Sequence, residues 1–122
     1  MMTEADEQKL LFQWSEWYAG QHPEVRLMFH IPNGGSRNPI EGKHLKEQGV
    51  KAGVPDILLP VARHGAHGLF IEMKRSKGGV LSRFQSEMLT DLMLNGYRCA
   101  VCHGYEEAKQ VIEEYLKGEE EC

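Results

Sequence analysis

The sequence predicts an α/β fold in which a mixed four-stranded sheet is flanked by helices on both faces. Three long segments have apolar residues at helical spacing, and four shorter apolar runs lie between them. The order of elements is helix, strand, short helix or loop, two strands, helix, strand, helix. The helix between the third and fourth strands forms a crossover, which makes those strands parallel. Helices on both sides would bury the apolar faces of the sheet.

The first segment predicts a helix that starts at Thr3 and ends near Gly20. Thr3 followed by Asp6 and Glu7 is a typical helix start, and an apolar stripe follows. Its members are Leu10, Leu11, Trp14, Trp17 and Tyr18. Glu7 falls in the middle of this stripe, and Glu4 lies toward its edge. Glu7 is therefore either a favourable partner for a helix N-terminus or a site residue that points inward.

Residues 25–31 alternate apolar and polar side chains, which predicts a half-buried strand. A turn-rich loop follows over residues 32–39, and a short helix is expected at about 40–48. This polar, basic stretch is either a plain surface loop or a contact for nucleic acid, in which backbone amides and cations meet phosphates. The candidate residues for that contact are Asn33, Gly35, Arg37, Lys43 and Lys51.

Two apolar runs, 57–59 and 69–74, carry charges where a buried strand should carry none. Asp56 precedes the first run, and Glu72 and Lys74 interrupt the second. A polar segment connects the runs, so they form an antiparallel hairpin or a close neighbouring pair. Because side chains alternate along a strand, Glu72 and Lys74 share a face, and Asp56 can converge with them.

Two carboxylates in a low-dielectric corner repel each other unless a cation lies between them. Oxygen ligands of this kind suit a hard divalent ion, Mg²⁺ before any other. Lys74 supplies a positive charge that can hold or deprotonate a water at the metal. Two other interpretations remain open: a structural ion pair of Lys74 with the acids, and a zinc site of His64 and His67 with His103 or a cysteine.

The last third of the chain predicts a helix, a strand and a final helix. Ser82 and Gln85 fit a capping box, which is a sufficient structural explanation for Gln85. The helix that follows has an inward stripe of Phe84, Met88, Leu89, Leu92 and Met93. A strand is expected at 97–103 and a helix at about 105–117.

The composition fits one intracellular domain. The chain has 122 residues, 41% hydrophobic and 26% charged. No run approaches the ~18 apolar residues of a membrane span, and the N-terminus is acidic rather than signal-like. We expect a single domain over residues 1–118, an acidic tail over 119–122, a cytoplasmic location and no membrane partner.

The net charge of −4 argues mildly against a nucleic-acid partner, but its distribution weakens that objection. Three of the acids lie in the tail, and Glu7, Asp56 and Glu72 are candidate metal ligands. Without those six acids the net charge is +2. The remaining cations are bunched in the middle of the chain, where Lys77 and Arg83 are further candidates for contacts with nucleic acid.

The three cysteines do not suggest a disulfide framework in an intracellular chain. Residues 99–103 match the haem-attachment pattern CxxCH. The segment alternates like a strand, so Cys99 and Cys102 face opposite sides. We therefore expect small core residues and no haem.

Residues 55–56 followed by 72–74 resemble the PD-(D/E)xK arrangement of a large nuclease superfamily. The sequence GVPD at 53–56, the strand 70–74, the downstream Gln85 and a glutamate on the N-terminal helix resemble its VRR-NUC branch, the virus-type replication and repair nucleases, which includes phage proteins. The bare motif occurs by chance, whereas the ordered set is specific. The resemblance covers about residues 7–101.

This resemblance implies a restriction-endonuclease-like core and a Mg²⁺-dependent DNA endonuclease, with Mn²⁺ as a substitute. Asp56, Glu72 and the carbonyl of Met73 would hold the metal, and Lys74 would orient or activate water. It also implies junction or branched DNA as the substrate, in replication, recombination or repair, and a homodimer with two sites. A catalytically inactive DNA-binding module of the same fold is the alternative.

Two further residues take their roles from the resemblance. Glu7 would match the family's helix carboxylate, as a ligand or through a ligand-bound water, with Glu4 as the competing choice. Gln85 would support Lys74 or the scissile phosphate. The insertion at 32–53 is longer than in compact family members.

Overall fold

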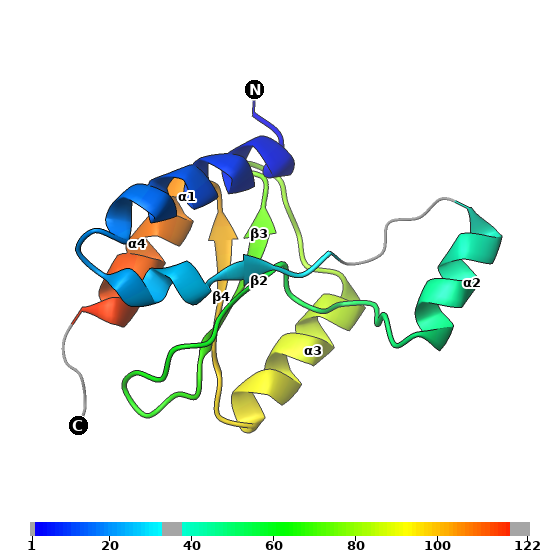
Figure 1. Ribbon diagram of the computed structural model, residues 1–122. Helices are drawn as coiled ribbons and strands as arrows, with labels where there is room; N and C mark the ends of the chain where they lie inside the picture. The colour runs from blue at the N-terminus through cyan, green and yellow to red at the C-terminus, as the bar shows by residue number, and fades with distance from the viewer. Residues whose placement is uncertain (1, 33–37, 118–122) are drawn as a thin grey trace.

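A computed structural model describes residues 2–32 and 38–117 of the chain. Within these ranges a four-stranded mixed sheet has the order β1-β2-β3-β4 (Figure 1). The strands are β1 Phe29–His30, β2 Ile57–Leu59, β3 Leu69–Lys74 and β4 Arg98–His103. β2 pairs antiparallel with β1 and with β3, whereas β3 and β4 are parallel. The mixed sheet, the antiparallel pair and the parallel crossover are thus confirmed.

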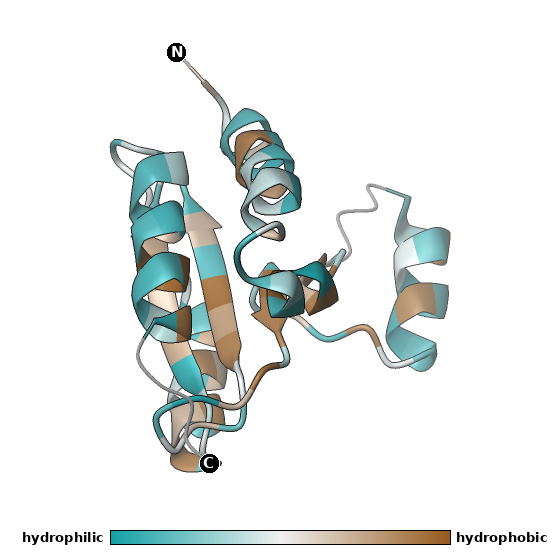
Figure 2. Cartoon of the chain, turned by 60° about the vertical axis from the view of Figure 1, so that its left-hand side comes forward, coloured by the Kyte–Doolittle hydropathy of each residue, from teal (hydrophilic) through white to brown (hydrophobic). Residues whose placement is uncertain are grey.

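Helices cover both faces of the sheet, as expected. They are α1 Glu4–Tyr18, the 3-10 helix η1 Pro23–Leu27, α2 Pro39–Glu47, α3 Arg83–Leu94 and α4 Tyr105–Leu116. Ile71 and Met73 belong to one apolar cluster with residues of α1 and α4. Glu72 and Lys74 face the opposite way, toward α3. Figure 2 shows brown, apolar stretches in the strands, and helices in which teal, hydrophilic residues alternate with brown ones.

The core is built from β2, β3, α1 and α4. Leu11, Ile57, Leu59, Ile71 and Ile112 are fully buried. Every residue of β3 is buried, including its two charged side chains. Burial of charged groups is costly without partners, so this strand demands a polar environment at one end.

The capping patterns read from the sequence are both present. The hydroxyl of Thr3 accepts a hydrogen bond from the N–H of Asp6, and the Asp6 carboxylate accepts one from the N–H of Thr3. The same reciprocal pair joins Ser82 and Gln85 at the start of α3. Local chemistry therefore sets the first residue of these two helices.

The strand predicted at 25–31 is wrong over most of its length. The chain forms η1 there, followed by the two-residue β1. Pro23 lies at the first position of η1, where its fixed φ favours a helical turn. Val25 and Met28 are buried, three residues apart, as in a 3-10 turn. Phe29, predicted to point inward, is 46% exposed.

Three residues assigned to inward helical stripes are exposed instead: Trp17 on α1, and Phe84 and Met93 on α3. Leu89 is the one buried residue of α3 within the described chain. Periodicity identifies an apolar stripe but does not say how much of it the sheet covers. The helix expected at about 105–117 is confirmed as α4, in which Ala108, Ile112, Tyr115 and Leu116 are buried.

The short helix expected at 40–48 is confirmed as α2, which stands apart from the sheet in both Figure 1 and Figure 2. Asn38 caps it, because its side-chain oxygen accepts from the N–H of Ile40 at 2.9 Å. No residue of α2 is buried. Across the described residues, no helix has the length and apolar character needed to cross a membrane.

We predict that Leu11→Ala lowers the free energy of unfolding by about 2–5 kcal/mol, because the cavity lies at the fully buried junction of α1 and the sheet. The control is Leu94→Ala at the exposed end of α3, which should change it by less than about 0.5 kcal/mol. Urea denaturation measures both. Equal losses from the two variants would contradict the placement of the core.

Candidate active site

Asp56, Glu72 and Lys74 meet where β2 begins and β3 ends. The Asp56 Oδ2 accepts a hydrogen bond from the backbone N–H of Met73 at 2.8 Å. The Lys74 Nζ lies 3.6 Å from the Glu72 Oε2, and both side chains are buried. The antiparallel register of β2 and β3 brings Asp56 beside the end of β3. The structure thus brings together the three charged groups that the sequence singled out.

Gln85 joins this cluster from the first turn of α3. Its Nε2 donates to the Glu72 Oε2 at 2.8 Å, and its Oε1 accepts from the Lys74 Nζ at 2.9 Å. The same Oε1 accepts from the N–H of Ser82 at 2.9 Å. Gln85 is therefore a capping residue and a member of the cluster at once. The capping role predicted from the sequence is present, but it accounts for only part of the contacts that Gln85 makes.

A close approach at Gly53 brings α3 to the cluster. The residue has a φ of +87°, and a Cβ there would lie 2.5 Å from the carbonyl oxygen of Phe84. Any larger residue would push the first turn of α3 away from the segment that carries Asp56. The glycine of the GVPD sequence is thus required by both backbone conformation and space.

The electrostatics of the cluster centre on Glu72. Burial, and after it the negative charge of Asp56, raise the pKa of Glu72 to about 7. The positive charge of Lys74 opposes these effects, and Glu4 adds a smaller upward contribution to the same pKa. A carboxyl poised near neutrality beside a second carboxylate is a typical feature of functional sites.

Glu7 makes different contacts from those expected of a metal ligand. It is buried, and its Oε2 accepts from the Ser76 hydroxyl at 2.8 Å. Its Oε1 accepts from the backbone N–H of Tyr105 at 2.7 Å. Gly104 precedes α4 and has no side chain to cap it, so Glu7 takes that role from α1. Of the two interpretations left open by the sequence, the structure favours the partner of a helix N-terminus.

The donor chemistry at the cluster fits a divalent cation. Asp56 and Glu72 supply carboxylate oxygens, the ligands that Mg²⁺ prefers. Two carboxylates lie here beside one ammonium group, and the charge of Asp56 contributes to the raised pKa of Glu72. Residues 2–32 and 38–117 contain no group of three or more His, Cys, Asp or Glu side chains already arranged to hold a metal.

The described residues do not support the alternative zinc site: they contain no group of three or more metal-binding side chains, and the three histidines contact separate elements. The Nε2 of His64 lies 3.0 Å from the carbonyl oxygen of Tyr115, and His67 packs against Tyr97. His103 lies at the other end of β4, with its Nε2 3.2 Å from the carbonyl oxygen of Gly79.

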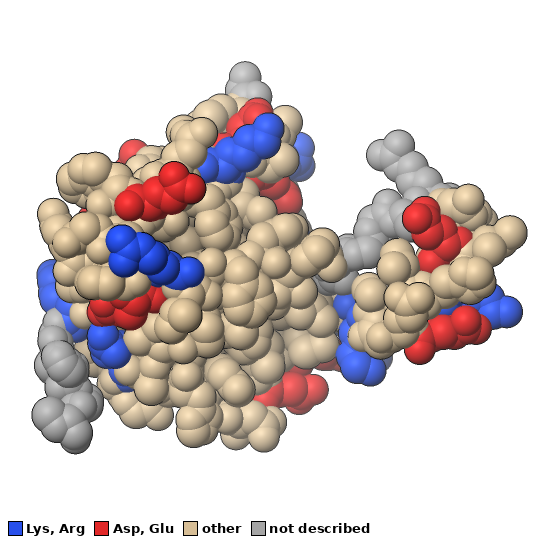
Figure 3. Space-filling model, viewed as in Figure 1, with Lys and Arg blue, Asp and Glu red and all other residues tan. Residues whose placement is uncertain are grey.

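The residues predicted to contact nucleic acid fall into three sets. Asn33, Gly35 and Arg37 lie outside the described residues. Lys43 and Lys51 are exposed on α2 and just after it, where acidic side chains are mixed with the basic ones (Figure 3). Lys77 and Arg83 are exposed near the cluster, and Arg83 pairs with Glu87 at 3.0 Å.

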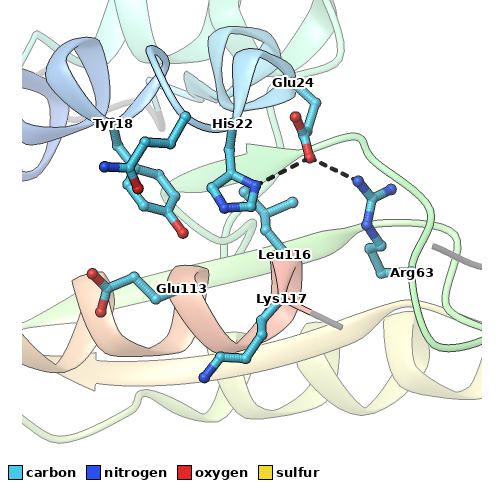
Figure 4. Close-up of a pocket in the computed structure, with 8 residues that line it drawn as sticks. Tyr18, His22, Glu24, Arg63, Glu113, Leu116 and Lys117 are labelled. Carbon is cyan, nitrogen blue, oxygen red and sulfur yellow. Dashed lines mark hydrogen bonds and ion pairs between the residues drawn. The ribbon is translucent and has the colours of Figure 1, made fainter. Parts of the chain in front are cut away.

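A hollow of about 510 Å³, separate from the cluster, opens where the end of α1 faces the end of α4 (Figure 4). Within it, Glu24 accepts a hydrogen bond from Arg63 at 2.7 Å and lies 3.6 Å from His22. Its lining among the described residues includes none of the predicted site residues. Glu24, Arg63 and His22 thus contact one another rather than the cluster.

Comparisons with known proteins agree with this geometry. A family model for the VRR-NUC domain matches residues 3–106. A solved structure described as a VRR_NUC domain protein is similar, with a TM-score of 0.82 and 30% sequence identity. The match covers 96% of this chain and 90% of that chain. No curated protein sequence matches the chain.

The raised pKa of Glu72 predicts a pH-dependent stability for the metal-free protein. Because the folded-state pKa of about 7 exceeds the ordinary value of 4.5, stability is present below pH 4.5 and is lost as pH rises through 7. Glu72→Gln should remove this loss. Urea denaturation from pH 4 to 9 should show the variant gaining on the wild type between pH 4.5 and 7. A constant difference would contradict the shift.

Glu7→Ala should lower the free energy of unfolding by about 1–3 kcal/mol, since it leaves the Tyr105 N–H and the Ser76 hydroxyl without their acceptor. Glu4→Ala, one turn earlier and exposed, should change it by less than about 0.5 kcal/mol. Thermal and urea denaturation compare the two. A larger loss from Glu4→Ala would overturn the capping role of Glu7.

Proposed function

Because the chain belongs to the VRR-NUC family, we propose that it is a Mg²⁺-dependent endonuclease that hydrolyses phosphodiester bonds in branched or junction DNA. A nuclease-type function and DNA as the substrate follow from the family. The metal dependence, the preference for branched DNA and the residue roles below are our proposal. We propose further that it acts in the cytoplasm, in replication, recombination or repair.

One observation carries the proposal: Gln85 hydrogen-bonds to both Lys74 and Glu72, and the carboxylate of Asp56 accepts from the backbone N–H of Met73, between them on β3. Lys74 lies closer to Gln85 than to Glu72, at 2.9 Å against 3.6 Å. A structural ion pair would place the ammonium group in close contact with its acid. Here the acids outnumber the cation, which supports a site that binds a second positive charge.

When bound, a divalent cation would neutralise charge on the phosphate and make water a better nucleophile. Asp56, Glu72 and the carbonyl oxygen of Met73 are the groups that would hold it. Glu7 would be the helix carboxylate, with Glu4 as the competing choice: Glu7 accepts from Ser76 and Tyr105, whereas Glu4 contributes to the raised pKa of Glu72.

Lys74 would act on the attacking water and on the phosphate. Its ammonium group can donate hydrogen bonds that orient the water, and its charge would stabilise the negative charge that develops at phosphorus. Gln85 restrains the ammonium group and orients Glu72 with the same amide. Both groups are thereby placed before the substrate arrives, which lowers the barrier.

The alternative is a DNA-binding module without activity. An inactive module would not need Asp56, Glu72 and Lys74 together with the amide that bridges two of them, and the structure retains all four groups.

We also propose a homodimer, in which two sites would cut two strands. The molar mass from light scattering tests it, and a monomer at working concentration would contradict it.

We predict that Asp56→Asn and Lys74→Ala each reduce cleavage by at least about 100-fold, with unchanged circular dichroism. The assay uses labelled linear, flap and four-way DNA with Mg²⁺, with Mn²⁺ and with EDTA. Lys117→Ala, an exposed lysine at the end of α4, is the control and should cut normally. Cleavage by Lys74→Ala at the wild-type rate, or cleavage in EDTA, would rule out the proposal.

A further inference from the structure

An exposed aromatic side chain lies directly beside the candidate site. Phe84 is 61% exposed in the first turn of α3, although helical spacing predicts it to face inward. It immediately precedes Gln85, whose amide contacts both Glu72 and Lys74. None of the ring contacts among the described residues involves Phe84. Val80, four residues earlier, is 79% exposed.

The surroundings of Phe84 are basic. Residues 75–86 contain Arg75, Lys77 and Arg83 and no acidic residue, and all three cations are exposed. Only Arg83 has an ion-pair partner among the described residues, Glu87 in the next turn of α3. Cations that follow a phosphate backbone, with an aromatic ring between them, are the combination that binds unpaired nucleotides.

The backbone of Phe84 is held in place relative to the site. Gly53 packs directly against its carbonyl group, and Asp56 follows three residues later in the chain. The capping box at Ser82 and Gln85 restrains the same turn. The ring therefore extends from a fixed stretch of backbone, one residue before the glutamine that contacts Glu72 and Lys74.

We propose that Phe84 stacks on an unpaired base of the DNA substrate, beside the bond that is cut. This inference rests on the proposed nuclease function and assigns a residue to its preference for branched DNA. In a continuous duplex both faces of each base are already covered, so a ring must first unstack one. At a branch the base is already free, and stacking on Phe84 favours that substrate. Lys77 and Arg75 would hold the adjoining phosphates.

The test compares Phe84→Ala with Phe84→Trp, which keeps an aromatic face, and with Leu94→Ala. Leu94 is 80% exposed at the far end of the same helix, so it controls for the loss of any exposed apolar side chain. Substrates are a flap DNA and a continuous duplex of the same sequence. Phe84→Ala should raise KM for the flap by about 5- to 100-fold with little change in kcat. Phe84→Trp and Leu94→Ala should resemble the wild type on both substrates.

A second measurement reports stacking without cleavage. With 2-aminopurine at the branch nucleotide, binding of the Asp56→Asn protein should quench the fluorescence. The double variant, Asp56→Asn with Phe84→Ala, should bind without this quenching. Equal quenching with and without Phe84 would overturn the proposal, as would an equal rise in KM on flap and duplex. If Phe84→Ala changes the molar mass measured by light scattering, the ring instead lies in a contact between two copies of the chain, and the stacking proposal is overturned. If the wild type cuts none of the DNAs, the proposed function fails and the fluorescence alone decides on stacking.

Discussion

The amide of Gln85 is the contact on which the arrangement of the site depends. It donates to Glu72 and accepts from Lys74, so one side chain sets the position of an acid and a base that are neighbours on β3. A neutral amide can do this because it has both a donor and an acceptor. A carboxylate in its place would repel Glu72, and a cation would repel Lys74. The first turn of α3 packs directly against Gly53, and this close contact brings the amide within reach of both groups.

A second constraint lies just after the end of β3, where the chain leaves the sheet. Glu7 holds the Ser76 hydroxyl, two residues after Lys74, and the first N–H of α4. Gly104 leaves space for this contact, since a Cβ there would lie 2.8 Å from the Ser76 Oγ. Three segments that are distant in sequence are thus joined by one buried carboxylate. Glu7 affects the position of Lys74 only indirectly, through Ser76 in the segment that follows Lys74.

Much of the site could be predicted because its signals are local. Glu72 and Lys74 stand out since charges are rare in an apolar strand, and the antiparallel pairing that brings Asp56 near them follows from two short runs joined by a polar segment. The spacing predicts Gln85 as a capping residue and the resemblance implies that it supports Lys74, but its contact with Glu72 is seen only in the structure. The partner of Glu7, Tyr105, is 98 residues away, and no periodic pattern could have identified it.

The sequence by itself determined the order of elements, the helix starts at Thr3 and Ser82, and the family motif, because these depend on neighbours within a few residues. Only the tertiary structure decided which apolar residues are covered and which carboxylate caps α4. Those outcomes depend on the angle and distance at which whole helices pack on the sheet. The exposed Phe84 illustrates the difference: its spacing predicts that it faces inward, but Leu89 is the one residue of α3 that the structure buries.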